Sequence, residues 1–484
     1  MKSIVFRLLV LGLMATQLHV EAAPRNRRKA SRAKAHAAET NSVQVTNAIP
    51  ASIDPWQQST VADAYERIGR RNPKWDAFAE KALHAYLADD NSGRWEQLIA
   101  TNAAAAIDAG SDDPLVRYVH ARRPLNPKQL SARERADAYA IAAEAMDASK
   151  YHSYWKYFAA IRASTWNRNA AGTNASPEAD RFFSMATNHL STALADSSVP
   201  SKEFYNAGLD LLRNVRKRDC EATWIWFERT YGKRAESDPT FWLLKGTTYT
   251  DFAWQARGSG VASTVTEEHW KKFSEQLSIA KRSLEKAWNL NSNDARIPTA
   301  MITVVLGMGT GRSTMELWFR RAMAIDPANE QACLNKLYYL EPKWYGSASD
   351  MLAFGRECAA SDKWGGKVPL VLVAAHEGLT TYLEGEARAN YWKQAEVWKD
   401  VHAAYTAFLA KNGNDLEQRQ HYARYAYRSG QWDEFKKQIA QVQVINYQIF
   451  GGRRAFNQML REANENSDTR PLRRPGPRQR KPSD

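Results

Sequence analysis

Residues 313–327 read STMELWFRRAMAIDP, and this stretch predicts the fold of the chain. Its apolar residues recur at i, i+4 and i+7 around Phe319, which is the spacing of one helix face, and Pro327 stops the helix. Phe319 lies 35 residues after Leu284, and Phe354 lies 35 residues after Phe319. A period of about 20–50 residues is typical of solenoids, whose units bury their apolar faces only against one another. We therefore expect an all-α chain, an α-solenoid of antiparallel helical hairpins.

Small and large residues alternate in the first hairpin of this block in a recognisable order. The residues concerned are Trp242, Gly246, Tyr249, Ala280, Leu284 and Ala287. Small residues let two helices approach closely, and large ones fill the space between them. The order resembles the tetratricopeptide repeat and, within it, an irregular exported bacterial family of unassigned function. Residues 258–267 depart from that pattern as an insertion between the two helices, and Gly430-Gln431-Trp432 gives the turn of a weaker, later unit.

Changes in composition divide the chain into six segments. No segment sustains the alternation of a strand, so no sheet is expected. We expect a signal peptide (1–22), a flexible basic linker (23–52), N-terminal helical hairpins (53–237), tetratricopeptide-like repeats (238–360), C-terminal helical repeats (361–465) and a disordered basic Pro/Arg tail (466–484). Within the N-terminal hairpins, Gly110 predicts the end of one helix, and Asp113 and Pro114 predict the cap and first residue of the next.

The first residues resemble an export signal. Lys2 gives a short basic start, residues 8–15 form an apolar core, and Val20-Glu21-Ala22 fits a small-residue cleavage pattern. No later run of about 18 apolar residues exists, so no transmembrane segment is expected. We expect a soluble, exported protein, periplasmic or extracellular.

Most of the net charge of +14 lies in the two ends of the chain. Residues 1–40 carry +6 and residues 466–484 carry +4, which leaves +4 for the rest. The basic excess therefore does not indicate a fold that binds nucleic acid specifically. The ends could contact an anionic envelope surface, or serve as solvated spacers.

Seventeen tryptophans permit two interpretations. They are either large wedges between packed helices or stacking platforms for sugars or bases. Most lie at helical spacing among other apolar residues, which favours wedges. The three cysteines leave a similar choice, because Cys333 and Cys358 on one predicted hairpin could pair or remain buried thiols.

Residues 307–314, GMGTGRST, superficially resemble a phosphate-binding loop. The match fails because Leu306 holds the first glycine position and Arg312 replaces the lysine. We interpret the glycines as a turn between two helices, with Ser313 and Glu316 as a capping box for the second helix.

No residue pattern identifies a catalytic centre, a metal site or a cofactor site. His376-Glu377 lacks the second histidine of a zinc motif, and no Gly-x-Ser-x-Gly elbow is present. The alternative to a non-enzyme is an all-α polysaccharide-degrading toroid, a lyase or glycosidase. Such an enzyme needs two carboxylates across a groove, or a Tyr/His base with an arginine, and spacing singles out no such set.

The function that we expect is a protein–protein interaction or scaffolding module. The resemblance implies that the first helix of each hairpin lines a groove for a peptide or partner helix. The residues placed there by register are Asn335, Gln420, Arg424, Tyr427 and Arg428. The last four would form a basic-aromatic patch suited to an acidic segment, with a solvated helix face as the alternative.

Overall fold

The computed structural model describes residues 53–89, 95–127, 129–172, 176–216, 219–467 and 472. The predicted signal peptide, linker and nearly all of the predicted tail lie outside these residues. The described part of the chain contains helices and no strand, so the all-α prediction is confirmed for it. None of its helices combines the length and apolarity needed to cross a bilayer.

The chain separates into two compact units, with the division between Leu244 and Lys245 inside helix α12 (Pro239–Arg257). The boundary predicted after residue 237 lies slightly earlier, and the segments 238–360 and 361–465 fall largely within one unit. The N-terminal unit contains α2 (Pro55–Thr60), α3 (Ala62–Ile68), α4 (Asp76–Leu87), α5 (Glu96–Asp108), α6 (Pro114–Arg122), α7 (Ala132–Asp147), α8 (Ser153–Ala171), α9 (Pro177–Ala195), α10 (Ser201–Asn214), α11 (Cys220–Tyr231) and η2 (Gly232–Ser237).

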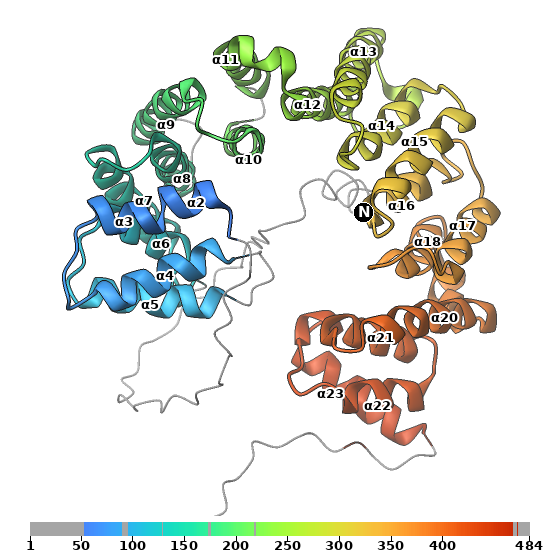
Figure 1. The fold of residues 1–484 in the computed structure, drawn as a ribbon. Coiled ribbons are helices and arrows are strands. Elements are labelled where there is room, and N and C mark those ends of the chain that lie inside the picture. The colour runs from blue at the N-terminus through green and yellow to red at the C-terminus, as the bar shows by residue number, and fades with distance from the viewer. Residues whose placement is uncertain are drawn as a thin grey trace, which may run out of the picture. The chain divides into compact units, whose positions relative to one another are not determined.

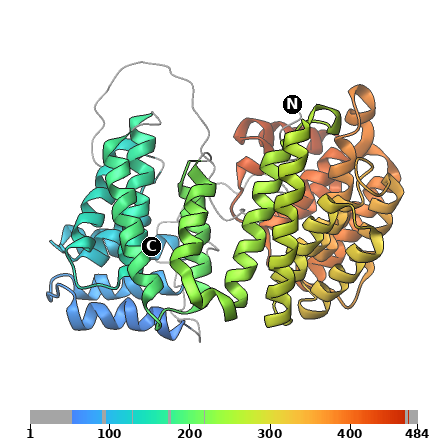
Figure 2. The ribbon, with the colours of Figure 1, turned by 90° about the horizontal axis from the view of Figure 1, so that it is seen from above.

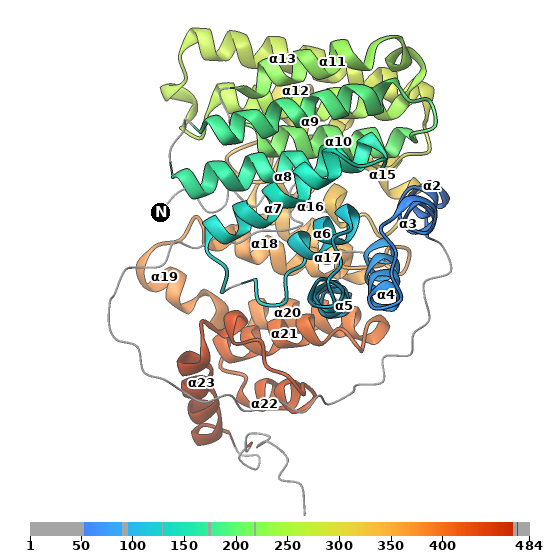
Figure 3. The ribbon, with the colours of Figure 1, turned by 90° about the vertical axis from the view of Figure 1, so that its left-hand side faces the viewer.

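From α2 to α9 each helix packs against the next, whereas α10 packs on α8 and α11 packs on α9 and α10 (Figure 3). Asp113 caps α6 as predicted, since its Oδ1 accepts from the backbone nitrogens of Leu115 and Val116. The structure adds a second role for this buried carboxylate. Its Oδ2 accepts from the Tyr151 hydroxyl at 2.9 Å and from the Arg70 backbone nitrogen at 2.9 Å. The cap therefore ties α6 to the segments that follow α3 and α7.

The C-terminal unit continues from α12 through alternating helices (Figure 1). These are η3 (Ala262–Thr264), α13 (Glu267–Leu290), α14 (Arg296–Met308), α15 (Arg312–Ile325), α16 (Glu330–Tyr339), α17 (Ala348–Ala360), η4 (Val368–Leu370), α18 (Val371–Thr380), α19 (Gly385–Asn390), η5 (Tyr391–Lys393), α20 (Ala395–Lys411), α21 (Leu416–Arg428), α22 (Trp432–Ala440), η6 (Tyr447–Phe450) and α23 (Arg453–Glu465).

Helices of this unit contact both their sequence neighbours and the next helix but one. Helix α14 packs on α13 and α15 but also on α16, α16 packs on α18, and α17 packs on α20. Figure 2 shows the helices of this unit following one another from yellow-green to red. Alternate helices therefore form two layers, one containing α14, α16 and α18 and the other containing α17 and α20.

The three predicted core wedges are all buried. Leu284 fills the space beside Gly246, where an added methyl group would lie 2.5 Å from Leu284 Cγ. Phe319 and Phe354 meet edge to face with ring centroids 5.5 Å apart. The residues at this spacing of 35 are thus all buried between helices, Leu284 against Gly246 and the two phenylalanines against each other.

The glycine run turns the chain between α14 and α15 as predicted. Gly309 ends α14 at φ 63° and Gly311 precedes α15 at φ 96°, values that favour glycine. The predicted capping box is wrong, because α15 begins at Arg312 and Ser313 already lies inside its first turn. Glu316 instead forms an ion pair with Lys336 at 2.8 Å.

All seventeen tryptophans lie in the described residues, and nearly all of them are packed between helices. Only Trp270 has an exposed side chain, and the others are buried or half-buried. The interpretation as helix wedges is therefore favoured over rows of open stacking platforms. Cys333 and Cys358 are buried free thiols, and the neighbouring Cys333 thiol, with burial, raises the pKa of Cys358.

Candidate functional site

Helix α18 is an apolar helix that carries two adjacent polar residues, His376 and Glu377. Successive residues of an α-helix point about 100° apart, because one turn takes about 3.6 residues. The two side chains therefore reach different neighbours. His376 bonds with residues of η5 and α20, whereas Glu377 bonds with residues of α21.

His376 joins a phenol to a carboxylate. Its Nδ1 lies 2.8 Å from Tyr391 Oη, and its Nε2 lies 3.1 Å from Asp400 Oδ2. Arg356 donates to both oxygens of Asp400, so that carboxylate acts only as an acceptor. Nε2 therefore carries the proton, and Nδ1 accepts from Tyr391. Burial lowers the pKa of His376 although Asp400 raises it, which keeps the imidazole neutral at pH 7.

Arg356 on α17 connects this chain of hydrogen bonds to solvent. Its Nε lies 3.1 Å from each oxygen of Asp400, and its Nη2 lies 2.8 Å from Oδ2. The Arg356 side chain is 52% exposed, whereas that of Asp400 is 10% exposed. The planar guanidinium matches the carboxylate in the paired geometry that arginine favours.

Glu377 begins a second branch with aromatic partners. Its Oε1 accepts from Tyr425 Oη at 2.8 Å and from Arg428 Nη1 at 3.0 Å. The Arg428 guanidinium lies 4.3 Å from the ring centroid of Trp392, and the Trp392 and Tyr425 rings are 5.0 Å apart. Burial and then the charge of Glu377 raise the pKa of Tyr425 well above its usual value. Arg428 thus combines an ion pair with a cation–π contact.

We call these residues the relay cluster. Its members are Arg356, His376, Glu377, Tyr391, Trp392, Asp400, Tyr425 and Arg428. They come from α17, α18, η5, α20 and α21, so the cluster ties together consecutive layers of the C-terminal unit. Its two guanidiniums face two carboxylates, which leaves the cluster without a net charge when His376 is neutral.

The chemistry of the relay cluster is that of a closed network. A phenol, an imidazole and an arginine are the groups that a Tyr/His proton-abstracting site would use. Here the imidazole is 2% exposed and Tyr391 is 9% exposed. Burial, with the charge of Asp400, raises the pKa of Tyr391 to about 12, so its phenol stays protonated at neutral pH. No group of three His, Cys, Asp or Glu side chains in the described residues is arranged to hold a metal ion.

Two of the five predicted partner-binding residues are buried and bonded within the fold. Asn335 donates from Nδ2 to the Thr299 carbonyl at 3.0 Å and accepts from Gln331 at 2.7 Å. Gln420 accepts from the Asn446 backbone nitrogen at 2.7 Å. Neither faces an open surface as the register predicted, because α16 is covered by α14 and α18, and the loop before η6 covers Gln420.

The other three residues lie on α21 with different surroundings. Arg424 is exposed, whereas Tyr427 and Arg428 are half-buried and each bonds a carboxylate. Tyr427 donates a hydrogen bond to Glu462. Burial and this bond raise the pKa of Tyr427 to about 12. The structure therefore brings Arg428 into the relay cluster and leaves Arg424 outside it. Partner binding by these three residues stays a prediction.

The relay cluster was not visible in the sequence. Its residues lie at 356, 376–377, 391–392, 400, 425 and 428, with no motif spacing. The only local signal was the pair His376-Glu377 within an otherwise apolar helix. No family model matches the chain, and no curated protein matches it either.

Proposed function

We propose that this chain is an exported α-solenoid of the tetratricopeptide-like kind that binds a protein or peptide partner. The support for the solenoid is the layered contact pattern, in which α14, α16 and α18 stack in succession and α17 stacks on α20. The close Gly246–Leu284 crossing supports the likeness to tetratricopeptide repeats, since it uses the small-large pair that the pattern predicts.

The binding face that we favour is that of helix α21. Helices α16 and α18 have no exposed residue, and α14 exposes only its first and last residues, Arg296 and Met308. Helix α21, by contrast, exposes Leu416, Glu417 and Arg424, and its Tyr425 and Tyr427 rings are half-buried. The later, weaker repeat therefore offers side chains to a partner that the stronger repeats do not.

The observation that carries the proposal is the unpaired charge of Arg424. Within the described residues Arg424 makes no ion pair, and together with the exposed Lys367 it acts on His421. Burial lowers the pKa of His421; among the charges nearby, Glu417 and Asp415 raise it, whereas Arg424 and Lys367 lower it. Two exposed cations that both act on His421 suit an acidic segment of a partner.

A labelled glutamate-rich decapeptide tests this surface directly. The double variant Arg424→Glu/Lys367→Glu should weaken its binding about tenfold or more at low salt, and added salt should weaken binding to the wild type. Lys399→Glu on α20 is the matched control, because its side chain is 76% exposed and its pairing with Glu396 is loose at 3.9 Å. Equal binding by the double variant and the control would refute the α21 face.

The partner itself is sought by capture from the envelope fraction followed by mass spectrometry, with the wild type and both variants as baits. A partner lost with Arg424→Glu/Lys367→Glu and kept with Lys399→Glu is the expected result. The export signal at 1–22 and any contact of the basic ends with an anionic surface lie outside the described residues and are part of the proposal.

A further inference from the structure

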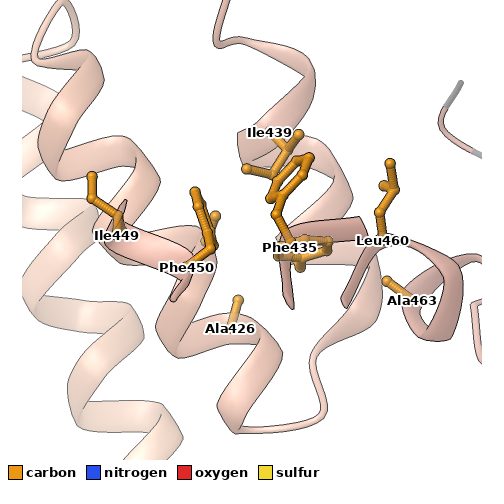
Figure 4. Close-up of a cluster of buried hydrophobic side chains, with 9 residues drawn as sticks. Ala426, Phe435, Ile439, Ile449, Phe450, Leu460 and Ala463 are labelled. Carbon is orange, nitrogen blue, oxygen red and sulfur yellow. The ribbon is translucent and has the colours of Figure 1, made fainter. Parts of the chain in front are cut away.

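The C-terminal end of the array carries an apolar cluster formed by α21, α22, η6 and α23. Its buried members are Ala423, Ala426, Phe435, Ile439, Ile449, Phe450, Phe456, Leu460 and Ala463 (Figure 4). Figure 4 shows Phe435 and Ile439 of α22 facing Leu460 and Ala463 of α23. A terminal repeat of an array has no following repeat to cover it, so something else must close this cluster.

Leu472, beyond the end of α23, packs against this cluster. Its backbone is held by one side chain, Asn464, through two hydrogen bonds. The Leu472 nitrogen donates to Asn464 Oδ1 at 2.8 Å, and Asn464 Nδ2 donates to the Leu472 carbonyl at 3.3 Å. The carboxamide thus pairs with both backbone groups of one residue, as a neighbouring strand would.

This arrangement separates two kinds of recognition. Both hydrogen bonds between the Asn464 side chain and Leu472 involve backbone atoms of Leu472, so this contact accepts any residue whose N–H and C=O are free. The apolar cluster contacts the side chain and therefore selects a leucine or a residue of similar shape. Ser467, which lies between α23 and Leu472, is tied to α22 by a bond from Lys436 Nζ at 2.8 Å and by a bond to Asp433.

We propose that the α22–α23 end is a docking site for an extended segment that presents a leucine, and that Leu472 of the same chain occupies it in cis. A single residue held by two hydrogen bonds and one apolar contact is weakly anchored compared with a packed helix. It stays bound because a short tether gives an effective concentration in the millimolar range. A partner's segment with a leucine and free backbone groups would compete with Leu472 for the site. Leu472 would therefore limit how tightly such a partner binds.

The probe is a fluorescein-labelled peptide with the sequence of residues 467–477, SDTRPLRRPGP. The full chain carrying Leu472→Asp should bind it saturably in fluorescence anisotropy, because its own tail then lacks the side chain that packs on the apolar cluster. The wild type should bind it about tenfold more weakly or worse, because the tethered tail competes. Equal affinity for the two chains, or no binding to either, would overturn the proposal.

Asn464 is tested on both sides of the contact. Adding Asn464→Ala to the Leu472→Asp chain should weaken peptide binding about tenfold, whereas adding Asn466→Ala should leave it unchanged. Asn466 is the matched control because it is exposed at the end of the same helix, and its side chain bonds only the Glu462 carbonyl. A peptide with N-methyl-leucine lacks the donated N–H and should bind as weakly, without any change to the protein.

Binding that is indifferent to both Asn464→Ala and N-methylation would refute the backbone clamp. A wild-type dimer that becomes monomeric with Leu472→Asp would refute occupation in cis, because the tail would then dock on a second copy. These outcomes are independent of the α21 face, since that test uses an acidic probe and substitutions at Arg424 and Lys367.

Discussion

A methyl group added at Gly246 should destabilise the C-terminal unit, contrary to the usual effect of Gly→Ala in a helix. In an open helix this substitution stabilises by about 1 kcal/mol. At Gly246 the new Cβ would lie 2.5 Å from Leu284 Cγ, 2.7 Å from Leu284 Cδ2 and 3.3 Å from the Ala280 carbonyl. Overpacking costs about 1–3 kcal/mol, so we expect Gly246→Ala to lose about 1 kcal/mol net.

Leu284→Ala supplies the complementary change. Leu284 is fully buried, so its truncation alone should cost about 2–5 kcal/mol through lost burial and the cavity left behind. In the double variant the methyl at position 246 enters that space, and the combined loss should be smaller than the sum by about 1–2 kcal/mol. Urea unfolding followed by circular dichroism measures these differences.

Gly378→Ala is the matched control in another helix interior. There the nearest atom to the added methyl is Met351 Cε at 3.0 Å, the end of a flexible side chain that moves at little cost. We expect this variant to be neutral or slightly more stable. Two results would refute the interpretation of this crossing as a size-matched pair. One is a loss of unfolding free energy in Gly246→Ala/Leu284→Ala equal to the sum of the two single losses, and the other is a Gly246→Ala variant that is more stable than the wild type.

Three further predictions follow from the site and the core. His376 has a folded pKa below its unfolded value of about 6.5, so its contribution to stability is present above that pH and is lost as the pH falls toward the folded value. Between pH 7.5 and 5.5 the wild type should therefore lose more stability in urea than His376→Gln, and equal losses would contradict this. Native alkylation should label the half-buried Cys220 before the buried Cys333 and Cys358, and the alkylation count after denaturation should be three with or without reductant. The enzyme alternative predicts reducing-sugar release on a polysaccharide panel, and the closed relay cluster leads us to expect none.

The helical architecture was largely readable from the sequence because its determinants are local. Gly309 and Gly311 adopt positive φ angles, which favour glycine, and Asp113 supplies the carboxylate that caps α6. Each requirement limits the residue type at its position, so each is visible in the sequence. The burial of Leu284, Phe319 and Phe354 was readable because large apolar residues at helical spacing mark the face that a helix packs against its neighbours. The capping box failed for the same local reason, since a shift of the helix start by one or two residues moves Ser313 out of the cap position.

The candidate site was much less predictable, because it depends on which helices lie beside one another. Register placed Asn335 on the first helix of a hairpin, but it could not show that α14 and α18 would cover that helix on two sides. The relay cluster combines residues of five elements whose polar groups are satisfied only after packing. Arg428 was predicted to face the groove in a basic-aromatic patch, whereas the structure pairs it with Glu377, 51 residues away in sequence.

The placement of the tryptophans allows their intrinsic fluorescence to report on the packing of the helices. Sixteen indole rings are shielded to different degrees within the array, and Trp270 alone has an exposed side chain. Collisional quenchers such as acrylamide should therefore reach Trp270 first, while the emission of the others reports whether the helices remain packed. The Trp270→Phe variant would lack the most accessible indole. Any increase in the fraction of its fluorescence that acrylamide quenches would then show that packed helices have separated.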